Sequence, residues 1–423
     1  MAKTSKSAAT PAPQPPYLKH VHLRNVPPLR DVQADFKPGL NIIIGKNGSG
    51  KTNFMRLVSE LVDLNKDKFR GLGSELSFKF DGEEVNIVFK ESKPKKNEGR
   101  VQLLTRNFPL TIAVAGKNEI LKTENLFVAI ASFIPSGNFG RWGLGYDVLT
   151  IWHGLPNHQL LIIDKGTDLS FDNSGGMSIM DSPEIQWELM TIFERALIDA
   201  MMPYDGGSPI NRFASTDPST VYQFITIRIN AQLSELNTYL PFYSPIERVR
   251  LGEQFQVYSN SARDELIIKG LLLEYLIGGD WLPFSALSDG TKRIFYLIGE
   301  LMTRDRVFED ESSIDSIDFE NNKIIFLEEP ELGIHPDQLQ LLLQLLREVS
   351  QKHQVILTTH SPQTLDMLSA RELDRITICE FIPGKGTQMR KLSPAKRKKA
   401  KAYLADEGFL SEFWRFSNLE DPD

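Results

Sequence analysis

The chain has 423 residues, of which 41% are hydrophobic and 24% charged, a composition that excludes a wholly disordered or fibrous protein. Its 48 Lys and Arg against 55 Asp and Glu give a net charge of −7, so any contact with nucleic acid has to come from local basic patches. Cys379 is the single cysteine, which excludes an intramolecular disulfide and indicates the reducing cytoplasm. No apolar run reaches the roughly 20 residues of a membrane span, so no membrane association is expected.

The N-terminal part of the chain alternates between strand-like and helix-like patterns after a leader. Residues 1–16 are rich in Ala, Pro, Ser and Lys and are predicted to be disordered. The apolar run Leu40–Ile44 predicts a buried strand that enters a glycine loop. The other predicted elements are strands at 19–26, 30–36, 75–80, 83–89 and 100–105 and a helix at 52–64.

The middle of the chain, 109–245, has fewer clear patterns. Strand-like pieces at 110–114 and 158–163 are joined there by helical stretches at 182–202 and 220–240. Strands are predicted again over 247–258. The apolar positions Leu271, Leu272, Leu273 and Leu276 then fit a helix, and the acidic stretch 308–320 is typical of a surface insertion.

The C-terminal part predicts a parallel sheet. Two apolar strands at 323–327 and 355–358 are separated by a helix at 336–350, and this alternation is typical of parallel α/β folds. A closing hairpin at 376–381 and 386–392 and a final helix at 402–416 complete the prediction.

Residues 45–52 read Gly-Lys-Asn-Gly-Ser-Gly-Lys-Thr and satisfy G-x-x-x-x-G-K-[ST] between a predicted strand and a predicted helix. Glycines let consecutive backbone N–H groups surround a phosphate, and the following helix turns its positive end toward it. Lys51 then reaches the β- and γ-phosphates, and the Thr52 hydroxyl is a ligand for Mg²⁺. The predicted nucleotide-binding residues are Gly45, Asn47, Gly48, Ser49, Gly50, Lys51, Thr52 and Asn53.

The strand at 323–327 delivers two adjacent carboxylates, Glu328 and Glu329, at its carboxyl end, where open α/β sheets bind ligands. Successive strand residues point in opposite directions, so we expect one carboxylate to face the metal ion and the other the attacking water. The alternative is that both are solvent-exposed glutamates at a strand end.

Two weaker signals accompany these motifs. Ser288, Asp289 and Gly290 precede an apolar-periodic helix, a position where a serine is also an ordinary N-cap. His360 follows the strand at 355–358, where a histidine is placed to donate to a γ-phosphate, although a lone histidine is more often structural.

In chain order, the segments GKNGSGKT, LSDGTKR, FLEEPELGIHP and TTHS resemble the Walker A, signature, Walker B with D-loop, and switch-histidine elements of ABC-type ATPase heads. The resemblance is nearest to the RecF/SMC/OLD-like branch and covers about 17–108 and 247–423. It implies the α/β fold of P-loop NTPases, with a mixed or antiparallel β lobe and a helical insertion lobe.

The resemblance implies a role for each matching residue of the head. Lys51 and Thr52 bind the phosphates of ATP and Mg²⁺, and Glu328 takes the metal-binding place of the usual Walker B aspartate. Glu329 matches the general base that polarises water, and His360 matches the switch histidine. No N-K-x-D guanine-reading motif follows the glycine loop, which favours ATP over GTP.

The resemblance also implies an assembly. In such heads the signature loop, here Ser288 and Gly290, caps the nucleotide held by a second subunit, and His335 falls where the D-loop contributes across the dimer. We therefore expect an ATP-dependent homodimer or higher homo-oligomer. Asp289 in place of a glycine and Glu328 in place of an aspartate are departures that predict slow hydrolysis without loss of binding.

The long separation of Lys51 from Ser288 predicts an insertion into the head. The expected domains are a leader (1–16), two halves of the head (17–108 and 246–393), an insertion lobe (109–245), and a basic segment with a closing helix (394–423). The stretch after His360 is too short for the Toprim nuclease domain of OLD-type relatives, so we expect any destructive activity to belong to a separate effector protein.

Two basic patches allow two interpretations. The residues 396–399 with Lys401, and 93–100, are suited either to DNA or RNA phosphates or to plain solvation. The leading hypothesis is an ATP-hydrolysing switch that controls a nuclease or toxin in bacterial defence against phage. The alternative is a RecF-like protein that uses ATP to bind DNA in repair or recombination. A transporter subunit is disfavoured by the large insertion.

Overall fold

The computed structural model describes residues 17–26, 28–62, 74–80, 83–89, 109–114, 117–122, 146–151, 167–171, 177–179, 197, 204–205, 208–209, 217–260, 265–302, 322–406 and 408–417. The chain divides into two compact units. The first comprises Met1–Thr150, Asn322–Pro330 and Glu348–Asp423, and the second Ile151–Asn321 and Glu331–Arg347. The elements expected at 1–16, 100–105, 158–163 and 308–320, and at 182–202 apart from Leu197, lie outside the described residues.

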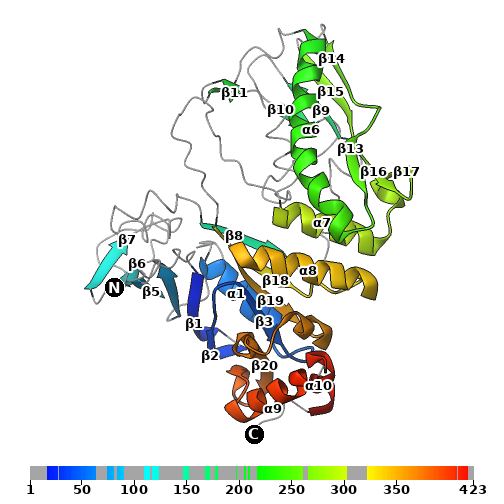
Figure 1. The fold of residues 1–423 in the computed structure, drawn as a ribbon. Coiled ribbons are helices and arrows are strands. Elements are labelled where there is room, and N and C mark those ends of the chain that lie inside the picture. Colours follow the sequence, from blue (N-terminus) through cyan, green and yellow to red (C-terminus); the bar gives the residue numbers. More distant parts are fainter. Residues whose placement is uncertain are drawn as a thin grey trace, which may run out of the picture. The chain divides into compact units, whose positions relative to one another are not determined.

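A six-stranded sheet forms the core of the first unit (Figure 1). Its order is β21 (Gly386–Lys391), β20 (Ile376–Ile382), β3 (Leu40–Ile44), β19 (Gln354–Thr359), β18 (Asn322–Glu328) and β8 (Tyr146–Ile151). The neighbours β20, β3, β19 and β18 run parallel, and β21 returns antiparallel to β20. The carboxyl ends of β3, β19 and β18 therefore meet at one edge, as the sequence predicts.

The strands β3 and β19 are buried along their whole length, which explains why they read as continuous apolar runs. The helix α1 (Lys51–Val62) packs against β18 and β19. The helix α8 (Pro336–Lys352) connects β18 to β19. These elements confirm the predicted parallel α/β arrangement.

A second sheet of the first unit is antiparallel and forms the β lobe. Its order is β2 (Leu29–Asp35), β1 (Tyr17–Val26), β4 (Glu75–Phe80), β5 (Glu83–Phe89), β6 (Pro109–Val114) and β7 (Lys117–Lys122). In β2, Leu29, Val32 and Ala34 are buried and alternate with exposed residues, which is the pattern of a sheet with one solvated face. The strands β6 and β7 carry this sheet beyond residue 108, where the sequence analysis ends the first half of the head.

The second unit combines a long helix with small antiparallel sheets. The helix α6 (Pro218–Tyr243) begins after the N-cap Asp217 and packs against β13, β14 and α7. One sheet has the order β13 (Arg248–Leu251), β16 (Leu273–Ile277), β17 (Asp280–Pro283), and the other β10 (Met177–Ile179), β9 (Thr167–Phe171), β15 (Glu265–Leu271), β14 (Gln256–Asn260). The remaining elements are β11 (Tyr204–Asp205), β12 (Ser208–Pro209), η4 (Phe284–Ala286) and α7 (Asp289–Met302).

The helix predicted around Leu271–Leu276 is wrong, because Leu271 ends β15, Leu272 joins the two strands, and Leu273 and Leu276 lie in β16. Leu273 and Tyr275 are buried, whereas Glu274 between them is more exposed, so the apolar side chains alternate with period two. Leucine content suggested a helix, but antiparallel pairing with β13 and β17 decides the conformation.

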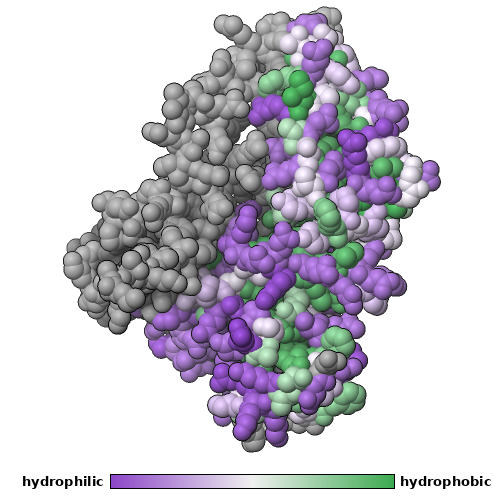
Figure 2. Space-filling view, viewed as in Figure 1, coloured by the Kyte–Doolittle hydropathy of each residue, from purple (hydrophilic) through white to green (hydrophobic). Residues whose placement is uncertain are grey.

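The C-terminal segment forms two helices, α9 (Pro394–Ala405) and α10 (Leu410–Ser417), where one was predicted. A Cβ on Gly408, between them, would lie 2.2 Å from the Tyr403 ring, so a larger residue there has to displace this ring. The backbone N–H of Ser411 donates to Asp366 in η5 (Pro362–Met367) at 2.8 Å, and η6 (Leu373–Arg375) precedes β20. In Figure 2 the surface over α9 is largely hydrophilic, whereas hydrophobic residues gather beside α10. None of the described helices is both long and apolar enough to cross a bilayer.

Candidate nucleotide-binding site

The glycine loop connects β3 to α1 and depends on backbone conformations that favour glycine. Gly48 and Gly50 have φ angles of +79° and +102°. A Cβ on Gly50 would lie 2.1 Å from the Thr387 hydroxyl oxygen, so a side chain is excluded there by space as well as by conformation. The helix α1 begins at Lys51, and its positive end faces the loop.

The hairpin of β20 and β21 packs against the loop and supports it. The Thr387 hydroxyl donates to the Ser49 carbonyl at 2.9 Å. A Cβ on Gly45 would lie 2.0 Å from the Cys379 carbonyl oxygen, so β20 passes directly against the loop. Burial raises the pKa of the Cys379 thiol to about 11, which keeps it neutral beside the phosphate site. Sequence reasoning missed both residues, since they lie more than 300 positions from the loop.

Lys51 and Thr52 occupy the positions that the motif predicts. Lys51 is 5% exposed, and its ammonium group donates to the carbonyls of Gly45 at 2.8 Å and Lys46 at 3.2 Å. The loop therefore encloses a positive charge. The Thr52 hydroxyl donates to a carboxylate oxygen of Glu328, which joins α1 to the end of β18.

Glu328 and Glu329 have different surroundings, although they are adjacent. Glu328 is 2% exposed and lies opposite Thr358 in the parallel pairing of β18 with β19. Glu329 has φ +41°, the single positive value at a non-glycine position among the described residues. Its backbone N–H donates to the Thr358 carbonyl at 2.9 Å, which holds this uncommon conformation. Such strain clusters at functional sites because the surrounding structure has to maintain it.

His360 lies directly after β19, next to Glu329. Its Nδ1 atom is 3.4 Å from the Glu329 carboxylate, and the two side chains are 39% and 19% exposed. The pair is thus accessible from solvent, unlike Glu328. The carboxyl ends of three neighbouring strands bring together Lys51, Glu328, Glu329 and His360.

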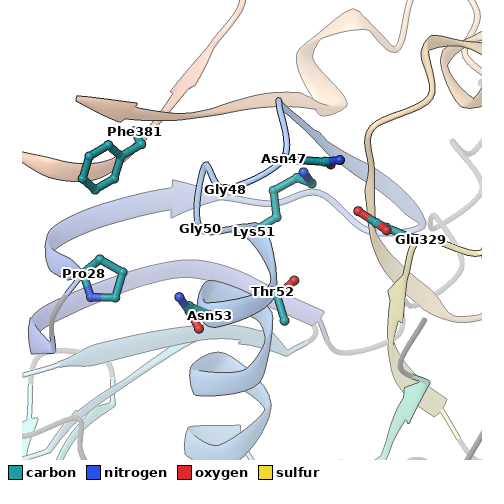
Figure 3. Close-up of a pocket in the computed structure, with 9 residues that line it drawn as sticks. All are labelled: Pro28, Asn47, Gly48, Gly50, Lys51, Thr52, Asn53, Glu329 and Phe381. Atoms are coloured by element: carbon teal, nitrogen blue, oxygen red, sulfur yellow. The ribbon is translucent and has the colours of Figure 1, made fainter. Parts of the chain in front are cut away.

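A pocket of about 410 Å³ opens at this edge of the sheet (Figure 3). Its lining residues are Pro28, Asn47, Gly48, Gly50, Lys51, Thr52, Asn53, Glu329 and Phe381. In the close-up, Glu329 lies at one end, Pro28 and Phe381 lie at the other, and the loop lies between them. Pro28 and Phe381 were not predicted, and no motif in the sequence marks them.

The donors present fit the coordination of Mg²⁺. The Thr52 hydroxyl and the Glu328 carboxylate are in direct contact, and P-loop proteins hold Mg²⁺ with one hydroxyl and one acidic residue together with phosphate oxygens. The Glu328 side chain is one methylene longer than the usual aspartate, and its carboxylate contacts the Thr52 hydroxyl. Within the described ranges no three His, Cys, Asp or Glu side chains cluster as a metal cage.

The signature residues belong to the second unit. The Ser288 hydroxyl accepts a hydrogen bond from the Thr291 backbone N–H at 3.2 Å, so Ser288 acts as the N-cap of α7. Asp289 is 96% exposed, and its carboxylate is 3.7 Å from the ammonium group of Lys292. These are bonds within one helix turn.

Gly290 and His335 lie in neighbouring turns of the same unit. A Cβ on Gly290 would lie 3.1 Å from the Gly333 carbonyl oxygen, so the two turns pass close to each other. The His335 side chain is 68% exposed and lies 3.5 Å from the Asp337 carboxylate at the start of α8.

The predicted basic segment 93–100 lies outside the described residues.

Two family models match the chain. The model described as "AAA ATPase domain" matches residues 17–125, and the model described as "AAA domain, putative AbiEii toxin, Type IV TA system" matches residues 212–366. The first includes the glycine loop, and the second includes Ser288, Glu328, Glu329 and His360. Both matches extend into the region 109–245 that was predicted as an insertion, the first over 109–125 and the second over 212–245.

The curated relatives match about a quarter of the chain. The chain is 28% identical over 109 residues to the DNA replication and repair protein RecF of Lactococcus lactis subsp. cremoris, and 26% identical over 110 residues to that of Streptococcus pneumoniae. Each match covers 26% of this chain and 27% of the relative, so the similarity spans about a quarter of either protein.

Two solved structures that align with the chain are the SMC head bound to the C-winged helix domain of ScpA, at 15% sequence identity, and the SMC head domain from Thermotoga maritima, at 13%. Their TM-scores are 0.46 and 0.42, and the alignments cover 90% and 89% of this chain and 99% of each of the other two. The family models and the curated relatives confirm the resemblance that the four motifs predict.

Proposed function

From the premise that the chain carries an ABC-type ATPase head of the RecF/SMC branch, we propose that it is an ATP-hydrolysing molecular switch. The observation that carries the proposal is that Lys51 and Glu329 line one pocket, with His360 beside Glu329 and with Thr52 and Glu328 in contact. Glu328 and Glu329 come from the end of β18, His360 follows β19, and Lys51 and Thr52 begin α1. Together these groups have the chemistry that phosphoryl transfer to water requires.

The residues divide the work of hydrolysis. Lys51 places a positive charge at the β- and γ-phosphates, and Glu329 orients the attacking water and accepts its proton. His360 donates a hydrogen bond toward the γ-phosphate, and its proximity to Glu329 couples the two side chains. Thr52 and Glu328 hold Mg²⁺, which neutralises the phosphate charge when it is bound. Asn47, Gly48, Ser49 and Gly50 supply the backbone N–H groups around the phosphates.

The second part of the proposal is a sandwich of two copies. Ser288, Asp289 and Gly290, with His335, contact the nucleotide that the other copy holds, so that dimerisation reports the bound nucleotide. The exposure of Asp289 and of His335 supports an intermolecular role, because both side chains are available to a partner surface. Hydrolysis then separates the copies and resets the switch.

Light scattering with and without ATP tests this mechanism. Glu329→Gln removes the proton acceptor and keeps the shape, so it should trap ATP and double the mass of the particle. Lys51→Ala should bind ATP poorly and stay at its original mass. If wild type and both variants keep one mass under all conditions, the switch mechanism is excluded.

The switch is proposed to control a separate effector, a nuclease or a toxin, in defence against phage. The family description names a putative toxin of a type IV TA system, which supports a place in such a system. Affinity purification of the Glu329→Gln variant with ATP should retain a protein that ADP releases. Recovery of the ATPase alone in both nucleotide states would count against an effector.

A second candidate, ATP-dependent DNA binding in repair, is favoured by the RecF relatives and by α9. Lys398, Lys399 and Lys401 are exposed on this helix. Binding through phosphates should weaken steeply as salt rises and require ATP, and hence Lys51. No binding at low salt would remove this candidate.

A further inference from the structure

The pocket has an apolar end that the phosphate chemistry does not use. Phe381 is 53% exposed, although the other apolar side chains of β20 are largely buried, and its ring lines the pocket with Pro28. Because it lines the pocket, this exposed aromatic ring is available for contact with a bound ligand. Figure 3 places both residues away from Glu329, at the opposite end of the glycine loop.

The register of β20 explains why Phe381 reaches this place. Ile378 pairs with Ile44, the last residue of β3, so β20 runs on beside the glycine loop. In the hairpin, Phe381 lies directly opposite Thr387, whose hydroxyl donates to the Ser49 carbonyl. Because opposite residues of an antiparallel pair point to the same face, the Phe381 ring lies on the face that holds the loop.

Pro28 is fixed by the same hairpin. Its carbonyl accepts a hydrogen bond from the Thr387 backbone N–H at 3.3 Å. A Cβ on Gly386 would lie 2.3 Å from that carbonyl oxygen, so the turn between β1 and β2 lies directly on β21. The two apolar side chains therefore belong to a supported frame.

We propose that Phe381 is the platform on which the nucleobase of the bound nucleotide stacks, with Pro28 as the adjoining apolar wall. The inference rests on the proposed function, since it requires the triphosphate to lie at Lys51. A base presents an apolar π face to an aromatic ring, and stacking of this kind accepts any purine. Phe381 supplies affinity for the base, and the loop supplies affinity for the phosphates.

Calorimetric titration of the full chain with a non-hydrolysable ATP analogue and with inorganic tripolyphosphate separates the two contributions. Phe381→Ala should weaken binding of the ATP analogue roughly tenfold and leave binding of tripolyphosphate unchanged. Phe381→Trp should retain affinity for the analogue and show additional fluorescence quenching by it. Phe416→Ala is the matched control, because Phe416 is 84% exposed and does not line the pocket.

Three results would overturn the inference. Analogue affinity within twofold of wild type in Phe381→Ala would show that the ring does not contact the base. An equal loss for tripolyphosphate would show that the ring supports the loop instead. Failure of the wild type to bind the analogue would overturn the proposed function together with the inference, whereas the first two results leave ATP binding by the head intact.

Discussion

The glycine loop and the signature loop both precede the first turn of a helix, yet different parts of the chain hold them. The glycine loop is fixed by residues that are distant in sequence: Thr387 bonds to Ser49, and Cys379 lies against Gly45. The hydrogen bonds of the signature serine are local, since Ser288 bonds to Thr291 in its own helix. A loop with distant support keeps its shape through the sheet, whereas a loop with local support keeps its shape through its helix.

This difference suggests how the two loops divide the proposed function. Phosphate binding needs a rigid cradle, because every backbone N–H group has to be placed before the ligand arrives. A contact across a dimer needs a side chain that stays exposed in the folded subunit, and Asp289 is exposed in this way.

The first prediction concerns the chemistry at the pocket edge. Glu329→Gln should lower kcat about 100- to 1,000-fold, because the amide cannot accept the proton of water. Affinity for ATP should change little, since the side chain is proposed to act on water. Steady-state phosphate release and nucleotide titration measure the two quantities. A parallel loss of affinity and of kcat would instead assign Glu329 to nucleotide binding.

The second prediction compares two glycines of one loop. Gly48→Ala meets no atom within 4 Å, so its cost is the positive φ alone, about 1 kcal/mol. Gly50→Ala has the same type of strain and also places its Cβ 2.1 Å from the Thr387 hydroxyl. We expect Gly50→Ala to be destabilised by about 2 kcal/mol more than Gly48→Ala in urea unfolding. In a double-mutant cycle, Gly50→Ala should cost less in a Thr387→Gly background than in the wild type, whereas Thr387→Ser, which keeps the hydroxyl, should leave that cost unchanged.

These supports explain what the sequence predicts and what it leaves out. The glycine loop, the strand before Glu328 and the helix at 336–350 carry local patterns, so their elements and order were predicted correctly. The strands at 271–276 were misassigned because pairing with β13 and β17, rather than the leucines themselves, sets their conformation.

The missing part of the site has the same physical origin. Phe381 and Thr387 reach the loop only because β20 aligns with β3, a register that no local pattern encodes. The positive φ of Glu329 likewise depends on a bond to the neighbouring strand. A motif predicts its own residues, while the residues that support it are found through the fold.

The third prediction uses pH to test the unit that contains the glycine loop. Burial, together with Lys323 and Lys352, lowers the pKa of His353 to about 4, and its Nδ1 accepts a hydrogen bond from the Lys323 backbone N–H. Between pH 6.5 and 4 the unfolded chain therefore binds a proton that the folded chain does not, so stability falls as the pH falls. The expected loss is on the order of 2 kcal/mol.

His353→Asn is the matched variant, since its side-chain oxygen replaces the Nδ1 acceptor and does not titrate. Urea unfolding at pH 7 and pH 4.5 should show a smaller acid-induced loss in the variant than in the wild type. An equal loss in both proteins would assign the acid sensitivity to other groups.

The fourth prediction separates the two roles of the signature serine. Aspartate and asparagine are both good N-caps. The free energies of unfolding of Ser288→Asp and Ser288→Asn should therefore lie within about 0.5 kcal/mol of the wild-type value. Aspartate adds a negative charge that the phosphates of a partner's nucleotide would repel. A cost of roughly 1 kcal/mol, about fivefold in the dimer Kd with ATP, is expected for Ser288→Asp relative to Ser288→Asn. Sedimentation in a Glu329→Gln background measures it, and equal dimerisation of the two variants would leave Ser288 only its role as the N-cap of α7.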